Sequence, residues 1–330
     1  MILERGKMKT CIIVLLVLTS CLSRAEAQHR SEKFAAYLFT YFTSNGEGGE
    51  QIRFALSKDG LNYKALNQND PIFLSKDISS TGGVRDPHIL RSNDGKLFYM
   101  VATDMYVAKN GWGPNHAMVL MKSSDLIHWS SAVVNIPKTF PEFAEVNRVW
   151  APQTIYDRET KKYMMYWSMR FGEGPDKIYY AYVNDDFTAL TTTPKQLFFH
   201  PNEMACIDGD IVFLDNQYHL FFKTEGGEAG IKKATSKKVN EGFVMLDQYL
   251  DQTTESVEGA GLFKLNNSST WILMYDVYRK GKYQFTKSND LLNFSVVDNE
   301  VSMDFHPRHG TVMPLTQKEY DRLVAKWSKQ

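Results

Sequence analysis

Polar side chains recur at one kind of place in this 330-residue chain, near the start of five short strand-like segments. The five segments are Arg85-Asp86-Pro87-His88-Ile89, Trp150-Ala151-Pro152-Gln153, Ile207-Asp208-Gly209-Asp210, Val257-Glu258-Gly259-Ala260 and Arg308-His309-Gly310-Thr311. Asp86, Asp208 and Glu258 supply three carboxyl groups at these positions. Two carboxyl groups can cleave a glycosidic bond, since one protonates the leaving oxygen while the other activates water or attacks the sugar. A third acid nearby would raise the pKa of the proton donor through like-charge repulsion.

The elements that must position these residues repeat with the same period. Each of the first four segments is followed by a turn and an aromatic strand, at 97–101, 163–167, 218–222 and 271–275. A second motif, Ser57-Lys58-Asp59-Gly60-Leu61-Asn62-Tyr63, returns at 123–129 and 287–294 as a polar turn followed by an aromatic residue. A repeat of roughly 50 to 65 residues containing about four short strands is typical of the blade of a β-propeller.

The two ends of the repeat are offset from one another. Residues 37–63 provide outer strands with no inner strand before them, while residues 309–315 provide an inner strand with nothing outside it. Pairing the C-terminal inner strand with the N-terminal outer strands would complete one blade and close the ring. We therefore predict an all-β, five-bladed β-propeller, with one short helix at 317–326. A two-sheet sandwich is the alternative, but it does not explain the offset.

The inner strands of a propeller line its central channel, so the polar residue of each segment should face the others. The residues expected to converge there are Asp86, Gln153, Asp208, Glu258 and His309. Formal net charge is zero, which argues against a nucleic acid or an anionic membrane as the partner. An oligo- or polysaccharide needs no net charge to bind. No protein partner is inferred. No nucleotide- or flavin-binding motif and no cluster with metal-ligand spacing appears in the sequence, and a reaction in which water attacks the sugar does not require a cofactor.

The first 27 residues have the layout of a secretory signal peptide, with Arg5, Lys7 and Lys9 ahead of an apolar run at 11–18. Two processing sites compete, Ala25-Glu26-Ala27 and a bacterial lipobox, Leu18-Thr19-Ser20-Cys21. We expect export, to the periplasm or, if Cys21 is acylated, to a lipid anchor on the envelope. An uncleaved membrane anchor is the alternative, although the apolar run is short for one. Residues 28–330 are then a single catalytic domain, whose one cysteine, Cys206, excludes an intrachain disulfide.

The five segments, in this order, resemble the bacterial glycosidases of glycoside hydrolase family 43, over roughly residues 37–323. The resemblance implies a five-bladed propeller and an inverting mechanism, in which water attacks the sugar directly. It also implies that Asp86 is the general base, Glu258 the general acid, and Asp208 the residue that orients the acid and tunes its pKa. His309 matches a histidine of the axial channel, which in relatives lies near a bound water or calcium ion.

Two segments depart from the family pattern. Many members carry an acid where this chain has Gln153, which we expect to bind sugar hydroxyls instead. Many also have proline after the third aspartate, where this chain reads Asp208-Gly209-Asp210. Strand alternation places Asp208 and Asp210 on the same face, and Asp208 lies nearer the motif position.

Three further residues are candidate sugar contacts. Trp150 could stack on a sugar face or pack in the core, and Trp112 lies in a Gly/Pro-containing loop that could border the pocket. Arg279 follows the Glu258 hairpin, where the family often places a substrate-contacting arginine; a surface ion pair is the alternative.

These observations favour an exo-acting inverting glycosidase of plant polysaccharide side chains, an α-L-arabinofuranosidase or a β-xylosidase. Galactofuranosidase, galactanase and endo-arabinanase activities within the same family remain open, as do the linkage and the oligomeric state. A retaining fructan-cleaving enzyme is disfavoured, because no Asn-Asp-Pro-Asn-Gly-type strand precedes residue 83. A carbohydrate-binding propeller without catalysis is disfavoured by the presence of all three acids.

Overall fold

The structure, a computed structural model, describes residues 33–226 and 229–328. The predicted signal peptide, with the lipobox ending at Cys21, lies outside the described residues. Within those residues, we find no helix with the length and apolar character needed to cross a bilayer.

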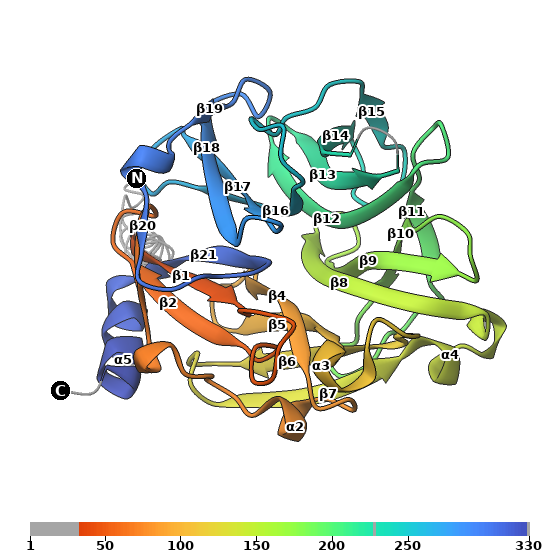
Figure 1. The fold of residues 1–330 in the computed structure, drawn as a ribbon, viewed down its shortest axis with the longest axis horizontal. Coiled ribbons are helices and arrows are strands. Elements are labelled where there is room, and N and C mark those ends of the chain that lie inside the picture. The colour runs from red at the N-terminus through yellow and green to blue at the C-terminus, as the bar shows by residue number, and fades with distance from the viewer. Residues whose placement is uncertain (1–32, 227–228, 329–330) are drawn as a thin grey trace, which may run out of the picture. The chain divides into compact units, whose positions relative to one another are not determined.

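Five β-sheets surround a central axis, so the predicted five-bladed propeller is confirmed (Figure 1). Blade 1 contains β21 (Gly310–Thr316), β1 (Phe34–Tyr41), β2 (Arg53–Ser57), β3 (Asn62–Ala65) and β20 (Ser302–Met303). Blade 2 contains β4 (Val84–Arg91), β5 (Phe98–Asp104), β6 (Ala117–Ser123) and β7 (Trp129–Asn135). Blade 3 contains β8 (Val146–Asp157), β9 (Lys162–Phe171), β10 (Lys177–Tyr182) and β11 (Lys195–Phe198).

The last two blades follow the same plan. Blade 4 contains β12 (Ala205–Leu214), β13 (Gln217–Glu225), β14 (Ile231–Ser236) and β15 (Val244–Leu246). Blade 5 contains β16 (Glu258–Lys264), β17 (Trp271–Val277), β18 (Lys282–Ser288) and β19 (Ser295–Val296). Short helices lie in the connections: η1 (Asn67–Asn69), α2 (Ser75–Ile78), α3 (Val107–Asn110), α4 (Ile136–Thr139), η2 (Pro141–Phe143) and η3 (Asp298–Glu300).

The ring closes in blade 1, as the offset of the repeat predicts. The C-terminal inner strand β21 pairs with the N-terminal strand β1, and the five inner strands β21, β4, β8, β12 and β16 contact one another in a closed circle. The C-terminal helix α5 (Gln317–Trp327) starts with a capping box formed by Thr316 and Glu319. Glu319 also binds Arg91 of β4 at 2.5 Å, which ties the end of the chain to blade 2.

The repeated Ser-x-Asp motif forms the turn after the third strand of the propeller repeat. In the copy at 57–62, the Ser57 hydroxyl accepts the N–H groups of Asp59 and Gly60, and the Asp59 carboxylate accepts those of Leu61 and Asn62. The same four bonds recur around Ser123 and Asp125, and three of them recur around Ser288 and Asp290. These side chains satisfy the backbone donors that the turn removes from the sheet.

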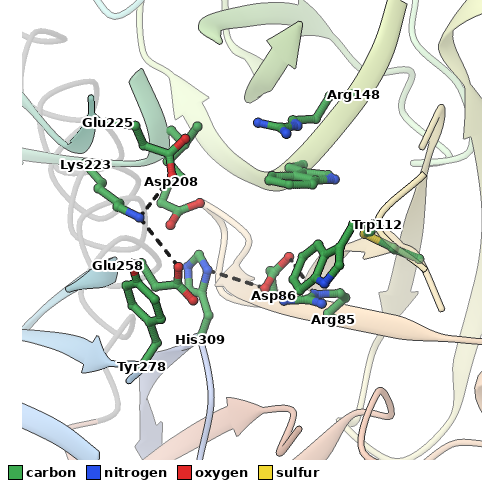
Figure 2. A pocket seen from close by; sticks show the side chains of 13 residues that line it. Arg85, Asp86, Trp112, Arg148, Asp208, Lys223, Glu225, Glu258, Tyr278 and His309 are labelled. Atoms are coloured by element: carbon green, nitrogen blue, oxygen red, sulfur yellow. Dashed lines mark hydrogen bonds and ion pairs between the residues drawn. The ribbon is translucent and has the colours of Figure 1, made fainter. Parts of the chain in front are cut away.

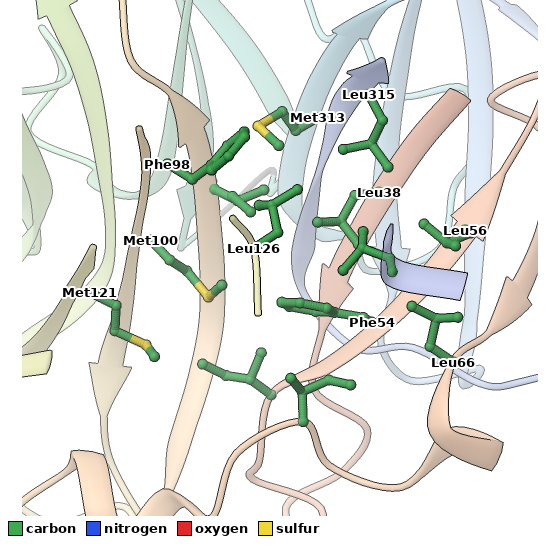
Figure 3. Packing of buried hydrophobic residues seen from close by; sticks show 14 of the residues in the cluster. Leu38, Phe54, Leu56, Leu66, Phe98, Met100, Met121, Leu126, Met313 and Leu315 are labelled. Atoms are coloured by element: carbon green, nitrogen blue, oxygen red, sulfur yellow. The ribbon is translucent and has the colours of Figure 1, made fainter. Parts of the chain in front are cut away.

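Each gap between neighbouring blades has its own hydrophobic cluster, which gives five clusters for five gaps. Figure 3 shows the cluster between blades 1 and 2, where Leu38 and Phe54 of blade 1 pack with Met100 and Met121 of blade 2 and Leu315 of β21. The core is therefore distributed around the ring and leaves the axis to polar side chains.

Candidate active site

Four inner strands carry a β-bulge at the same place, and the bulge sets the direction of the site residues. The register shifts between Arg85 and His88, Trp150 and Gln153, Ile207 and Asp210, and Glu258 and Gly261. The first bulged residue has a positive φ in every case: 51° at Asp86, 44° at Ala151, 53° at Asp208 and 65° at Gly259. Bulges re-aim side chains, and backbone strain of this kind gathers at functional sites.

The bulges border a cavity of about 330 Å³. Its walls are formed by Arg85, Asp86, Met105, Trp112, Arg148, Trp150, Ile207, Asp208, Lys223, Glu225, Glu258, Tyr278 and His309. Figure 2 shows Asp86, Asp208 and Glu258 directed into this cavity, with His309 between Asp86 and Glu258. The structure thus brings together six of the eight residues that the sequence singles out.

Asp86 lies among positive and hydrogen-bonding partners. Its Oδ2 accepts a bond from the Thr103 hydroxyl at 2.8 Å and lies 3.7 Å from Nε of Arg85, while Oδ1 lies 3.5 Å from Nδ1 of His309. Burial alone would raise the pKa of Asp86, but Arg85, His309 and Thr103 together lower the pKa to about 2. Asp86 is therefore ionised across the physiological range, as a base must be.

His309 occupies the centre of the carboxyl cluster and is buried. Burial lowers its pKa, but Asp208 and Asp86 outweigh burial and raise the pKa to about 9. A protonated imidazolium donates hydrogen bonds from both of its ring nitrogens. A Cβ at Gly259 would lie 2.7 Å from the His309 ring, so the residue after Glu258 must be glycine both for space and for its positive φ.

Calcium takes six to eight oxygen ligands. Across residues 33–226 and 229–328, no group of three or more His, Cys, Asp or Glu side chains could hold a metal ion. None of the steps below uses a calcium ion.

Asp208 lies beside the backbone of the predicted acid. Its Oδ2 accepts the N–H of Gly259 at 3.0 Å, which fixes the residue that follows Glu258. Burial is the largest influence on Asp208 and raises its pKa. His309 lowers the pKa and Glu258 raises it, and the net result is a pKa of about 6. Asp210 does not share this site, although strand alternation predicts that it should; it lies beyond the bulge, and its Oδ2 accepts the N–H of Leu262 at 2.6 Å.

Glu258 is partly exposed to the cavity and held by two cations. Its Oε1 lies 2.6 Å from Nη2 of Arg308, and its Oε2 lies 3.7 Å from Nζ of Lys223. Lys223 also pairs with Glu225 at 3.1 Å. Sequence reasoning missed Lys223 and Glu225, although Lys223 directly follows the buried apolar run Leu220-Phe221-Phe222 of β13, which is a usable signal.

Aromatic and guanidinium groups form the opposite side of the cavity. The Trp112 ring is 56% exposed and lies 6.0 Å from the Trp150 ring, centroid to centroid. Arg148 lies over Trp150 at 3.7 Å and is paired with Asp176 at 2.6 Å. Exposed aromatic faces of this kind can stack on a sugar.

Gln153 is not among the residues that line the cavity, and a sugar-binding role does not fit its place. The bulge at Ala151 and Pro152 gives Gln153 the register of His88 and Asp210, so its side chain is buried below the cavity and accepts a bond from the Tyr166 hydroxyl at 2.9 Å. The expectation that it faces Asp86 is wrong, because simple alternation ignores the two inserted residues.

This deeper layer links neighbouring blades. Side chains at the register of Gln153 accept N–H groups from the next inner strand: Thr311 from Ile89, His88 from Thr154, Asp210 from Leu262, and Gln153 from Ile211 through the Tyr166 hydroxyl. The layer is structural, and it supports the floor of the cavity.

Arg279 also lies outside this cavity. It is exposed, lies over the Tyr278 ring at 5.9 Å, and lines a neighbouring pocket that shares Lys223, Glu225 and Tyr278 with the main cavity. A direct contact with a sugar bound between Asp86 and Glu258 does not follow from this placement.

Known proteins resemble this chain in sequence and in fold. The family model Glyco_hydro_43_rel, described as a probable glycosyl hydrolase domain, matches residues 32–321. An α-L-arabinofuranosidase of Bifidobacterium longum subsp. longum is 25% identical over 235 residues, which are 62% of this chain and 21% of the relative. The chain thus spans about a fifth of the length of that curated relative.

Solved structures share the fold at low sequence identity. An α-L-arabinofuranosidase from Clostridium thermocellum superposes with a TM-score of 0.58 at 14% identity, covering 84% of this chain and 97% of the other. A xylan β-1,4-xylosidase from Bacillus halodurans has a TM-score of 0.58 at 15% identity, covering 84% of this chain and 55% of the other. At these identities the likeness supports the propeller fold alone.

Proposed function

The chain belongs to the glycosyl hydrolase domains related to family 43, and from this premise we propose that it is an inverting, exo-acting glycoside hydrolase. The observation that carries the proposal is the convergence of Asp86, Asp208 and Glu258 on one cavity, with Asp86 kept ionised by Arg85 and His309. We assign Asp86 as general base, Glu258 as general acid and Asp208 as the residue that orients the acid.

In the proposed reaction, Asp86 takes a proton from a water molecule whose oxygen attacks the anomeric carbon. Glu258 donates its proton to the glycosidic oxygen as the carbon–oxygen bond breaks, and the bonding electron pair leaves with that oxygen. Water attacks from the face opposite the leaving group, so the configuration inverts. The Asp208 contact with the N–H of Gly259 holds the strand that presents Glu258.

We propose an α-L-arabinofuranoside as the preferred substrate, with a β-xyloside second. The curated relative named as an α-L-arabinofuranosidase supports the first. The compact cavity, with Trp112 at its edge, suits a terminal sugar of a side chain better than the middle of a polymer. Export to the periplasm or the envelope, supported by the signal-like residues 1–27, would place the enzyme near plant-type polysaccharide.

The test is hydrolysis of a panel of nitrophenyl glycosides: α-L-arabinofuranoside, β-D-xyloside and β-D-galactofuranoside. We expect the arabinofuranoside to be cleaved with the highest kcat/KM. Cleavage of the galactofuranoside alone would overturn the substrate assignment. Absence of turnover on the panel and on polysaccharides, together with binding to a polysaccharide array, would overturn the enzymatic proposal and favour a binding module.

A further inference from the structure

The carboxyl group of Glu258 is held asymmetrically by its two cations. Nη2 of Arg308 is at hydrogen-bond distance from Oε1, 2.6 Å away, whereas Nζ of Lys223 lies 3.7 Å from Oε2, which is beyond a hydrogen bond. Oε1 is therefore occupied by a donor, and Oε2 is the oxygen with room for a proton.

Arg308 is itself fixed on three sides. Its backbone N–H donates to the carbonyl of Phe42 at 2.7 Å, its guanidinium lies 5.6 Å from the centre of the Phe42 ring, and its Nε bonds Oδ2 of Asp276. Asp276 is fully buried on β17, directly opposite Glu258 in the β16–β17 register. The guanidinium thus bridges two carboxylates that are cross-strand neighbours, which leaves it little freedom to turn.

The position of Asp276 has a different use in other blades. The residues paired with the start of each bulge are Thr103, Ser168, Lys223 and Asp276 in blades 2 to 5. In blades 2 and 3 the hydroxyl accepts the N–H of the next bulge, Ala151 to Thr103 at 2.8 Å and Asp208 to Ser168 at 3.1 Å.

In blades 4 and 5 the same position instead carries a charge directed at the Glu258 system. Lys223 reaches Glu258 itself, and Asp276 reaches it through Arg308. In blades 2 and 3 this position bonds the neighbouring blade, whereas in blades 4 and 5 its side chain acts on Glu258. In blade 5 this arrangement buries the Asp276 carboxylate, whose Oδ1 has no hydrogen-bond partner among the described residues.

We propose that Arg308, held in place by Asp276, is a positioning residue for the general acid, and that it leaves Oε2 of Glu258 as the oxygen that carries and donates the proton. This inference rests on the proposed function. When the proton passes from Oε2 to the glycosidic oxygen, Glu258 becomes a carboxylate, and Arg308 and Lys223 are already placed to stabilise that charge without rearrangement.

The test compares two substrates with the same sugar and different leaving groups. The leaving group of a 2,4-dinitrophenyl glycoside departs as a stable dinitrophenolate anion and needs little protonation. The leaving group of a phenyl glycoside is a much stronger base, so its departure depends on the general acid. We expect Asp276→Asn and Arg308→Lys each to lower kcat on the phenyl glycoside by about ten- to a hundredfold, and on the dinitrophenyl glycoside by less than about threefold. Glu258→Gln should show the same selectivity with a larger loss.

A matched control is available on the same blade. Lys287→Gln removes one partner of the half-exposed Lys287–Glu300 pair and should leave both rates unchanged. Thermal unfolding of each variant separates misfolding from misplacement of the acid, and Asp276→Asn retains Arg308 should the arginine variant fold poorly. Equal losses on both substrates, or no loss on either, would overturn the positioning role. A wild-type protein that cleaves neither substrate would instead count against the proposed function.

Discussion

Asp86 in blade 2 and Asp208 in blade 4 occupy the same place in the repeat and titrate in opposite directions. Both are the first bulged residue of an inner strand, with φ values of 51° and 53°, and both line the cavity. Yet the pKa of Asp86 falls to about 2, while that of Asp208 rises to about 6. The backbone repeat therefore does not decide the protonation of its side chains.

The residue before each aspartate accounts for much of the difference. Arg85 precedes Asp86 and places a guanidinium 3.7 Å from its carboxylate, whereas Ile207 precedes Asp208 and offers no charge. Glu258 and Asp86 add negative charge near Asp208, and burial is left to dominate its pKa. One fold thus supplies an ionised base and a weakly acidic neighbour from equivalent positions, because their surroundings differ.

The largest expected effect comes from removing the ionised member of the pair. Asp86→Asn should lower kcat by at least about 10³-fold, because the amide cannot take a proton from water. Steady-state kinetics on the best aryl glycoside measures this loss. Asp186→Asn, at an exposed aspartate, serves as the matched control and should keep full activity. Activity of Asp86→Asn close to wild type would remove Asp86 from the mechanism.

Asp208→Asn should have a smaller effect, a fall in kcat of about ten- to a hundredfold. The Asn oxygen can still accept the N–H of Gly259, so the strand stays in place while the charge beside Glu258 and His309 is lost. The same assay checks this. A loss larger than that of Asp86→Asn would mean that the base and the orienting residue have been exchanged.

Arg85→Leu makes the surroundings of Asp86 resemble those of Asp208. Removal of the cation raises the pKa of Asp86, and because the base must be ionised, activity at acidic pH should fall. We expect the acid limb of kcat/KM to move upward by about one pH unit. Rates from pH 3.5 to 8, with circular dichroism at each pH, measure the shift. An unmoved acid limb would show that Arg85 does not set the pKa of Asp86.

Asp210 shows what burial does to the stability of the fold at a carboxyl group that does not line the cavity. Its pKa is raised to about 7, chiefly by burial, so the folded state binds the proton more tightly than the unfolded state and stability falls as pH rises from about 4 to 7. Asp210→Asn avoids the buried charge while keeping an acceptor for Leu262. Relative to wild type, the variant should gain stability at pH 8, by at most about 4 kcal/mol, and little at pH 4. A calorimetric gain that is the same at both pH values would contradict this account.

The smallest effect on catalysis is expected at Gln153. Gln153→Leu removes the acceptor of the buried Tyr166 hydroxyl and should cost about 1–3 kcal/mol of stability. KM should change by less than about twofold, because the side chain lies below the cavity and contacts no substrate. Chemical denaturation and kinetics together check both values. A large rise in KM with unchanged stability would return Gln153 to the sugar site.

The repeat could be predicted from the sequence because its polar turns and aromatic strands recur at blade spacing, and because the offset of its ends requires closure. The bulges could not be predicted from alternation, which places Gln153 beside Asp86 and Asp210 beside Asp208. Pro87 and Pro152 were a signal for them. Proline lacks an N–H and is confined to edges or bulges, so its presence in central strands implies a break in the ladder.

The residues around Glu258 required three-dimensional information. Asp276 and Arg308 are 32 positions apart and meet only because β21 closes the ring beside β16. A charged residue in the apolar strand β17 was nevertheless visible in the sequence. Pairing it with an arginine across the closure depends on the register, which the sequence alone does not fix.

The central claim is a single displacement in which Asp86 activates water and Glu258 protonates the leaving group. The most direct test is ¹H NMR of the first-formed sugar during hydrolysis of the best aryl glycoside, recorded before mutarotation. The account predicts an anomer of configuration opposite to the substrate, which then equilibrates. First-formed product with the substrate's own configuration would show that a carboxylate attacks the sugar, and would contradict the assignment of Asp86 as a base.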